Sequence, residues 1–435
     1  MTRLNFLATA RTKVPQGCDG PTFHSSVASG SSTSNLRRVP AWLLLATLVS
    51  ASAARAAPVQ TEGGAYTRYE LLAPATHKFR IRYAITATAE GATAYYNPVR
   101  PGSTASDEAV IDAATGKPLT FTEVDGAVAK AGGVADALPG NRFIAVTLAR
   151  AVAKDGGGRI IIDKTYADAK SYYIDGDAIV FDRSLGIKRN SVVLPPGYRL
   201  TACNVPAQVI EQPDGRVAVS FLNATPAPMP LVLRARPGQS STPPPSSLAG
   251  KITERAAQTR EIVYYLQQPE SHAFDLTHDY TETRAGTAAY VNIVRAGSRV
   301  SNPSARDLDT GAALPFATVH GAAVKAAEPD ATDVTDDTTA VVFRFAPVRA
   351  GESRRLRIVE TYTDAARYSL TGDELVWHRS FGRPANAVVL PAGWRVTNSS
   401  VPATVSEQAD GRIRLDFVNA RNDEIDVIIT ARRAS

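Results

Sequence analysis

Apolar and polar residues alternate along much of this chain with the period of two that is typical of half-buried β-strands. In one clear case, Phe79, Ile81, Tyr83 and Ile85 alternate with mostly polar residues. Further short runs rich in Val, Ile, Phe and Leu predict strands at 142–148, 159–163, 178–182, 191–194 and 216–222. Turn-forming residues separate these runs, at 114–116, 155–158, 175–177, 195–197 and 213–215.

Helical periodicity is weak. Short helices are possible around 105–113 and 127–135, and the segment 251–266 could open as a helix before a strand near Ile262. Many short strands at this spacing are typical of an antiparallel sandwich or barrel. We therefore expect an all-β protein built as a β-sandwich.

The pattern occurs twice. Residues 165–224 and 361–420 share 31 identities in 60 ungapped positions, at an offset of 196. Earlier in the chain, 69–87 matches 264–282 at an offset of 195. Between the copies, 239–251 is rich in Pro and Ser and favours an extended spacer. The sequence predicts a tandem duplication with a first sandwich at 62–238, the linker at 239–251 and a second sandwich at 252–435.

Residues 1–56 are interpreted as an export signal and N-terminal extension. Arg37 and Arg38 precede an apolar run at 41–52, and Ala54-Arg55-Ala56 is a cleavage pattern. About a dozen apolar residues are too few for a spanning helix, which needs about 20, so no membrane anchor is expected after cleavage. The expected location is periplasmic or secreted.

The charge balance argues against one class of partner, and the cysteine content argues against an internal disulfide. Residues 1–56 hold six of the 48 basic residues and one of the 42 acidic residues, so the remaining chain has a net charge of +1. This balance argues against a nucleic-acid partner. Cys203 would be alone after cleavage, and its counterpart in the second copy is Ser399, so no internal disulfide is expected.

Each copy opens with the pattern YxLxxPxxHxF, at 69–79 and 264–274. This pattern resembles the N-terminal β-sandwich domain of the alanyl- and glycyl-aminopeptidase families, in which a zinc peptidase domain follows. The resemblance implies a sandwich fold and an exported setting. No HExxH motif occurs in the sequence, so the zinc site of those families has no matching positions here. We expect no cofactor and no metal.

Aromatic residues recur at equivalent positions and provide the candidate binding site. Aromatic rings on a sandwich can stack on sugars or contact peptides, and two copies would add avidity. The alternative is that these rings pack in the core. The candidate binding residues are Tyr95, Tyr172, Tyr198, Tyr290, Tyr368 and Trp394.

Hydrolytic chemistry is the alternative hypothesis. Ser184 and Ser380 occupy equivalent Arg-Ser-x-Gly segments, and His378 lies beside the second of them. No GxSxG motif accompanies these serines, and an ordinary turn or bulge after a strand explains them as well. In that interpretation Arg183 and Arg379 pair with Asp177 and Asp373 across a hairpin.

The retained histidines and an acidic segment are interpreted as structural features. His77 and His272 are retained in both copies and are expected to be structural imidazoles with their hydrogen bonds satisfied. The acidic segment 328–337 matches no defined calcium loop and is expected to be solvated.

Together these patterns favour an exported, non-enzymatic binding or accessory protein of the cell envelope. The expected partner is an envelope polymer or another protein. The alternative is a hydrolase with His378 and Ser380 in a site of the second repeat or at the domain interface.

Overall fold

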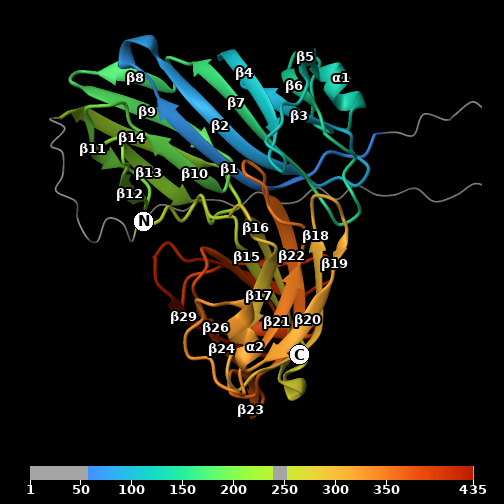
Figure 1. Ribbon diagram of the computed structural model, residues 1–435. Helices are drawn as coiled ribbons and strands as arrows, with labels where there is room; N and C mark the ends of the chain where they lie inside the picture. Colours follow the sequence, from blue (N-terminus) through green and yellow to red (C-terminus); the bar gives the residue numbers. More distant parts are fainter. Residues whose placement is uncertain (1–56, 239–251, 435) are drawn as a thin grey trace, which may run out of the picture. The chain divides into compact units, whose positions relative to one another are not determined.

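The computed structural model describes residues 57–238 and 252–434 (Figure 1). The predicted export segment at 1–56 and the Pro/Ser linker at 239–251 lie outside the described residues.

The first repeat is built from three sheets. A seven-stranded sheet has the order β12-β13-β10-β1-β2-β7-β4, a four-stranded sheet the order β11-β14-β9-β8, and a three-stranded sheet the order β3-β6-β5. The strands are β1 (Glu62–Leu71), β2 (Lys78–Ala87), β3 (Ala94–Val99), β4 (Thr104–Asp112), β5 (Phe121–Asp125), β6 (Arg142–Thr147), β7 (Gly158–Ala167), β8 (Tyr172–Asp175), β9 (Ala178–Leu185), β10 (Arg189–Val193), β11 (Tyr198–Cys203), β12 (Gln208–Glu211), β13 (Val217–Leu222) and β14 (Met229–Pro237).

The second repeat has the same three sheets. Their orders are β19-β18-β22-β16-β15-β25-β28-β27, β23-β24-β29-β26 and β17-β21-β20. The strands are β15 (Glu261–Leu266), β16 (Ala273–Glu282), β17 (Ala289–Ile293), β18 (Arg299–Asp307), β19 (Ala313–Leu314), β20 (Phe316–His320), β21 (Thr339–Arg344), β22 (Arg354–Thr363), β23 (Tyr368–Thr371), β24 (Glu374–Phe381), β25 (Ala385–Val389), β26 (Trp394–Ser399), β27 (Thr404–Glu407), β28 (Ile413–Val418) and β29 (Ile425–Arg433).

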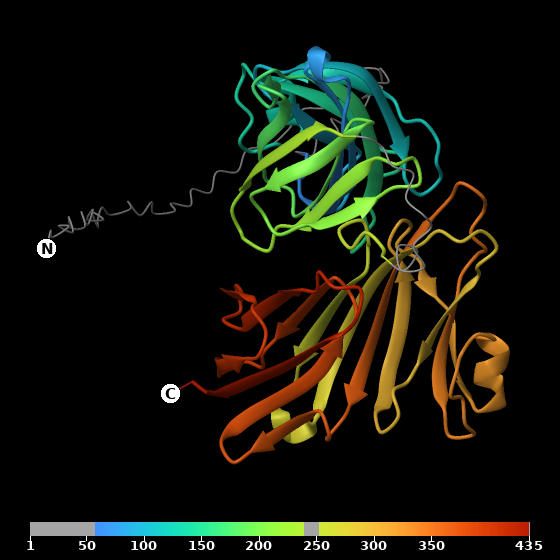
Figure 2. The same ribbon diagram turned by 90° about the vertical axis from the view of Figure 1, so that its left-hand side faces the viewer.

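The two repeats correspond strand for strand, apart from the two-residue β19. Strand pairing is antiparallel throughout both repeats except for β1 with β10 and β15 with β25, which pair in parallel. The prediction of an all-β chain with a duplicated, sandwich-like unit is confirmed. Figure 2 shows the many strands of each repeat by their colours, blue to green for the first and yellow to red for the second.

Within the described residues, only one of the three predicted helical segments contains a helix. The segment 127–135 does contain a helix, α1 (Gly126–Ala131), which Asp125 caps by accepting a hydrogen bond from the Val128 amide. Its counterpart is α2 (Ala322–Ala327). The segment 105–113 is wrong as a helix and forms most of β4. No helix opens the segment 252–260, and β15 begins at Glu261.

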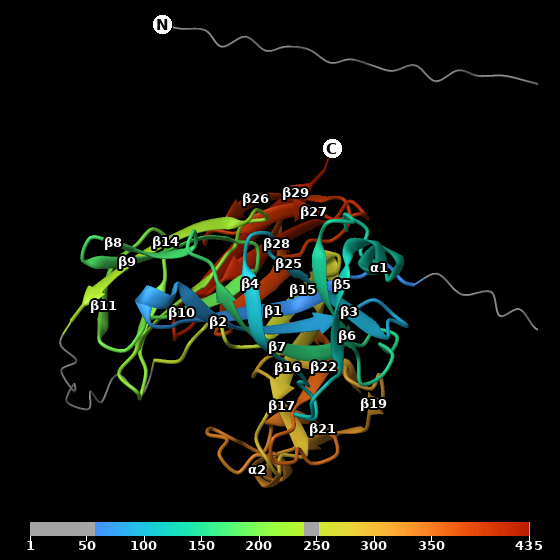
Figure 3. The ribbon, with the colours of Figure 1, turned by 90° about the horizontal axis from the view of Figure 1, so that it is seen from above.

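Each three-stranded sheet carries one of these helices beside it. Figures 1 and 3 both show β3, β5 and β6 gathered near α1, and α2 follows β20 directly in the second repeat. The sheets matter for function because β3 and β17 supply polar side chains to cavities described below.

Core packing follows from the alternation in sequence. The side chains of Phe79, Ile81, Tyr83 and Ile85 are all buried in one cluster, as their period of two predicts. In the second repeat Phe274 and Leu276 occupy the equivalent positions in its core. No helix among the described residues is long and apolar enough to cross a membrane.

Candidate functional site

A cavity of about 520 Å³ opens inside the first repeat. Its walls come from the large sheet, through β1, β2 and β7, from β3 and β6 of the three-stranded sheet, and from β9. Lys164, Asn97, Tyr95, Tyr166 and Arg183 line it.

A second cavity, of about 240 Å³, occupies the equivalent place in the second repeat. Of its 13 lining residues, 12 align with residues that line the first cavity. Six of these pairs are identical: Tyr69 with Tyr264, Tyr95 with Tyr290, Asn97 with Asn292, Arg100 with Arg295, Tyr166 with Tyr362, and Arg183 with Arg379. The cavity is therefore a feature of the repeat and not an accident of packing in one copy.

A charged residue on an inward strand position marks both cavities. In β7 the side chains of Ile160, Ile162, Lys164 and Tyr166 are buried at alternate positions, so the lysine falls in the phase of core residues. In β22 the equivalent charged residue is Glu360. This pattern is visible in the sequence as a charged residue in the apolar phase of each strand, but the predicted site residues did not include Lys164 or Glu360.

In the first cavity Lys164 is only 5% exposed, and its ammonium group donates a hydrogen bond to Asn97 Oδ1. The ammonium group also lies 5.0 Å from the centre of the Tyr166 ring. Burial, reinforced by the charge of Arg183, lowers the pKa of Lys164 to about 8. Tyr95 donates a hydrogen bond to the carboxylate of Glu62 at the cavity wall.

In the second cavity Glu360 is 1% exposed, and its Oε2 accepts a hydrogen bond from Asn292. The same amide group donates to the Tyr362 hydroxyl at 2.8 Å. Glu360 Oε1 has no hydrogen-bond partner among the described residues. Burial raises the pKa of Glu360 to about 7, although the hydrogen bonds from Asn292 and Tyr362 oppose the shift.

His278 replaces Tyr83 in the second cavity. Its Nδ1 lies 3.2 Å from the Tyr290 hydroxyl, while its Nε2 has no partner within the described part of the chain. Burial lowers the pKa of His278 to about 3, with the nearby arginines Arg260, Arg383 and Arg355 adding to the shift. The imidazole is thus neutral at physiological pH, with an unsatisfied nitrogen in the cavity wall.

An arginine surrounded by aromatic rings is common to both sites. The Arg183 guanidinium carbon lies 5.4 Å from the Phe79 ring centre, and that of Arg379 lies 5.2 Å from the Phe274 ring centre. Arg183 also pairs with Asp168 at 3.3 Å. The predicted pairing of Arg183 with Asp177 is wrong, because Arg183 points inward from β9 while Asp177 lies in the exposed turn before it and pairs with Arg236.

The six predicted aromatic residues do not share one environment. Tyr172 and Tyr368 are 0% exposed and Trp394 is 3% exposed, so these three rings lie in the cores and offer no open face for stacking. Tyr198 is half-buried against the first core. Tyr95 and Tyr290 line the two cavities at equivalent positions, so a binding role stays open for this pair, although the Tyr95 ring is only 1% exposed and also belongs to the first core.

The residues of the alternative hydrolytic site lie on β24. His378 Nε2 is 2.7 Å from Asp426 Oδ1 on the neighbouring β29, and both side chains are substantially exposed. No hydrogen bond joins Ser380 to His378 among the described residues, and neither residue lines a cavity described here. Ser184 and Ser380 lie within β9 and β24, so the prediction of a turn or bulge after a strand is wrong.

The remaining candidates have structural roles. His77 Nδ1 lies 3.0 Å from the Tyr172 carbonyl oxygen, and His272 Nδ1 lies 2.8 Å from that of Tyr368, as expected of satisfied imidazoles. The thiol of Cys203 donates to the Val205 carbonyl, and the hydroxyl of Ser399 donates to the equivalent Val401 carbonyl. Within 57–238 and 252–434 no group of three or more His, Cys, Asp or Glu side chains is placed to hold a metal ion.

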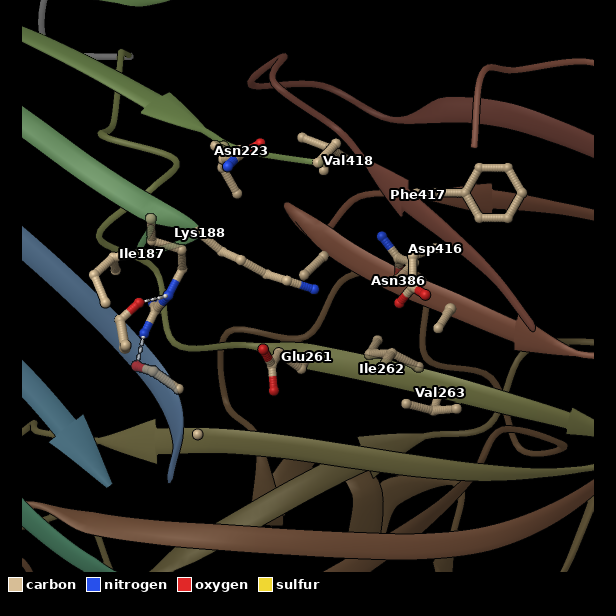
Figure 4. Close-up of a pocket in the computed structure, with 18 of the residues that line it drawn as sticks. Ile187, Lys188, Asn223, Glu261, Ile262, Val263, Asn386, Asp416, Phe417 and Val418 are labelled. Carbon is tan, nitrogen blue, oxygen red and sulfur yellow. Dashed lines mark hydrogen bonds between the residues drawn. The ribbon is translucent and has the colours of Figure 1, made fainter. Parts of the chain in front are cut away.

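A further cavity, of about 480 Å³, is shown in Figure 4. Ile187, Lys188 and Asn223 of the first repeat and Glu261, Asn386 and Asp416 of the second are among its lining residues. This cavity draws on both repeats at once, so it has no second copy with which its polar residues can be compared.

No protein-family model and no curated protein matches this sequence. Among solved structures, the chain is similar to an M1 zinc metallopeptidase from Deinococcus radiodurans, with 13% identity and a TM-score of 0.27, over 42% of this chain and 43% of that one. It is also similar to an aminopeptidase N family protein from Idiomarina loihiensis, with 11% identity and a TM-score of 0.24, over 39% of this chain and 29% of that one. A third similar structure is the collagen adhesin of S. aureus, with 8% identity and a TM-score of 0.15, over 73% of this chain and 83% of that one. The chain thus spans less than half the length of either peptidase, and these two belong to the family class that the opening motif of each repeat resembles.

Proposed function

We propose that this protein is an exported, non-enzymatic binding protein of the cell envelope that holds a small ligand in a pocket inside each repeat. One observation carries the proposal: 12 of the 13 residues that line the second cavity have counterparts lining the first. Polar residues inside a repeat are costly unless they are satisfied, so their retention in both copies favours a shared binding role.

The unsatisfied atoms support this interpretation. Glu360 Oε1 and His278 Nε2 are buried, line the cavity and have no partner among the described residues. Native proteins leave few such atoms unpaired, and those that remain call for an explanation. A bound ligand that hydrogen-bonds to these atoms provides one.

The proposal is tested by a thermal-shift screen of residues 57–435 against small metabolites, with pocket variants beside the wild type. A ligand present at 100 times its Kd stabilises the native state by about 2.7 kcal/mol and raises the melting temperature by several degrees. Asn97→Leu and Asn292→Leu each remove a polar group from one pocket, and Asn398→Leu changes an exposed asparagine on β26 as a control.

The expected result is a compound that stabilises the wild type and Asn398→Leu but fails to stabilise one of the pocket variants fully. A screen in which every active compound stabilises all four proteins equally would contradict binding in these pockets.

Export is the second part of the proposal, and the tripartite segment at 1–56 supports it. Cell fractionation followed by N-terminal sequencing of the purified protein tests it. We expect a mature chain outside the cytoplasm that begins near Ala57, whereas a cytoplasmic protein that still begins at Met1 would refute export.

A further inference from the structure

The two pockets contain more positive charge than their acidic residues balance. In the first pocket Arg183 has Asp168 as a partner, but no carboxylate of the described residues lies within 4.0 Å of the buried Lys164 ammonium. Of the acidic residues, only Glu62 lines this pocket, where it accepts hydrogen bonds from Tyr95 and Tyr83.

The second pocket has the same imbalance. Arg295, Arg379 and Arg383 all line it, and none of them forms an ion pair among the described residues. Burial and the charge of Arg379 lower the pKa of Arg295, and burial together with Arg260 lowers that of Arg383. Such crowding of like charges in a cavity destabilises the empty protein and is relieved by an anion.

The Lys164/Glu360 position adds a hydrogen-bond donor in each pocket. Below its pKa of about 8 Lys164 is an ammonium group, and only one of its three donors is used, by Asn97. Below its pKa of about 7 Glu360 is a carboxylic acid, whose Oε1 can carry the proton because Oε2 accepts from Asn292. A lysine and a glutamate that look opposite in sequence therefore present the same donor chemistry once protonated.

The surroundings of each group are consistent with this role. Glu360 shares its pocket with Tyr264 from β15, His278 from β16, Tyr290 and Asn292 from β17, Tyr362 from β22, and the pocket arginines. The titratable or charged side chains that line the pocket of Lys164 are Glu62, Tyr69, Tyr83, Tyr95, Tyr96, Tyr166, Arg100 and Arg183. Glu108 of β4 also acts on its charge.

We propose that each pocket binds a small anion, a carboxylate or a phosphate, through the donor at the Lys164/Glu360 position and the arginines that both copies retain. This inference rests on the proposed function, since it assigns a ligand class to the same pockets. The smaller second pocket sets the tighter size limit, so the anion that it takes is small.

Isothermal titration calorimetry of residues 57–435 with benzoate and phenyl phosphate tests the inference, and benzamide serves as the uncharged probe of similar shape. At pH 6 both anions, or one of them, should bind, and benzamide should bind at least about tenfold more weakly. The tighter of the two anions identifies the carboxylate or phosphate class. Affinity should fall by up to about tenfold per pH unit, above pH 7 for the second pocket and above pH 8 for the first, because the bound anion needs the protonated donor.

Two variants assign these effects to the pockets. Lys164→Met should remove the first site, whereas Lys78→Met, at an exposed lysine on β2, should leave both sites intact. Glu360→Gln keeps a donor that does not titrate, so it should preserve binding and abolish the pH dependence near 7, with the exposed Glu407→Gln as its control. If a variant fails to fold, the pH dependence of anion binding by the wild type still tests the proposal.

Equal binding of benzamide and the anions, or a wild-type affinity that does not change between pH 6 and 9, would overturn the anion assignment. Absence of anion binding up to about 10 mM would also overturn it. Neither result would refute small-ligand binding itself, which the thermal-shift screen of the pocket variants decides separately.

Discussion

An aromatic residue retained in both copies can either line a cavity or pack in the core. Tyr95 and Trp394 are both buried core residues with aromatic counterparts in the other copy, yet Tyr95 also lines one of the two cavities described above and Trp394 lines neither. Retention of an aromatic residue is consistent with either role, because stacking and packing both need a large apolar ring. Only the three-dimensional neighbours separate them.

Trp394 provides a test at this scale. Its ring is buried, its Nε1 donates to Gln268 Oε1 at 2.9 Å, and Arg433 lies over it at 4.9 Å. Trp394→Ala should therefore lower the free energy of unfolding by about 3–5 kcal/mol, measured by chemical denaturation. Ile428→Ala, at an exposed position on β29, should change it by less than about 0.5 kcal/mol. A Trp394→Ala protein as stable as the wild type would show that the ring is not part of the core.

Glu360 and His278 should give opposite pH effects on stability. The pKa of Glu360 is higher in the folded state than its usual value of 4.5, so its contribution to stability falls as the pH rises from about 4.5 to 7. The pKa of His278 is lower than its usual value of 6.5, so its contribution is present above 6.5 and is lost as the pH falls toward 3. The two effects oppose each other between pH 4.5 and 6.5.

The Glu360→Gln substitution should isolate the effect of Glu360. We expect the stability of Glu360→Gln, relative to the wild type, to rise by roughly 3 kcal/mol between pH 4.5 and 7, because the variant lacks the unfavourable ionisation. Urea denaturation at a series of pH values measures this. Parallel profiles for the two proteins would mean that Glu360 titrates normally in the folded state.

At the scale of elements, the period of two identified most strands of the large sheets but did not reveal β3 and β17. The β3 sequence AYYNPV contains a proline and a central asparagine, which are unfavourable in strands. The three-stranded sheet tolerates them because β3 is an edge strand, paired only with β6. β3 carries Tyr95 and Asn97, and β17 carries Tyr290 and Asn292, so the polar wall that these strands give each pocket was not predicted.

Strands β4 and β18 share a bulge whose backbone conformation can be tested. Each has a bulge where it pairs with β7 or β22, and Asp107 and Asn302 adopt left-handed backbone angles there, with φ of 56° and 50°. Asp and Asn tolerate this conformation better than other non-glycine residues.

Asn302→Val should lower the free energy of unfolding by about 1–2 kcal/mol, because a β-branched residue is strained at positive φ. Asn302→Gly should be close to neutral, and Ser304→Val, on the same strand without positive φ, is the matched control. Melting temperatures of the three variants decide this. Equal losses for both valine substitutions would point to side-chain contacts and away from backbone strain.

At the scale of the whole molecule, the duplication was the most informative feature of the sequence. It predicted that both halves have the same strands, and the sheets correspond in order. The comparison of the two copies did not identify the Lys164/Glu360 position, because a lysine aligned with a glutamate reads as a divergent position and not as a shared site. Their common property, a protonated donor in a buried position, depends on burial and not on residue type.

The duplication further predicts that residues 62–238 and 252–435 each fold without the other. Each half contains its own three sheets and its own hydrophobic clusters, and a domain of about 150 residues buries roughly 70% of its surface, which is enough for independent stability. Each half, expressed alone, should give a strand-rich circular dichroism spectrum and one cooperative unfolding transition. Its own pocket should respond to the same anions as in the full chain. Halves that are unfolded alone and gain structure only when mixed would show that the duplicated unit is not an autonomous domain.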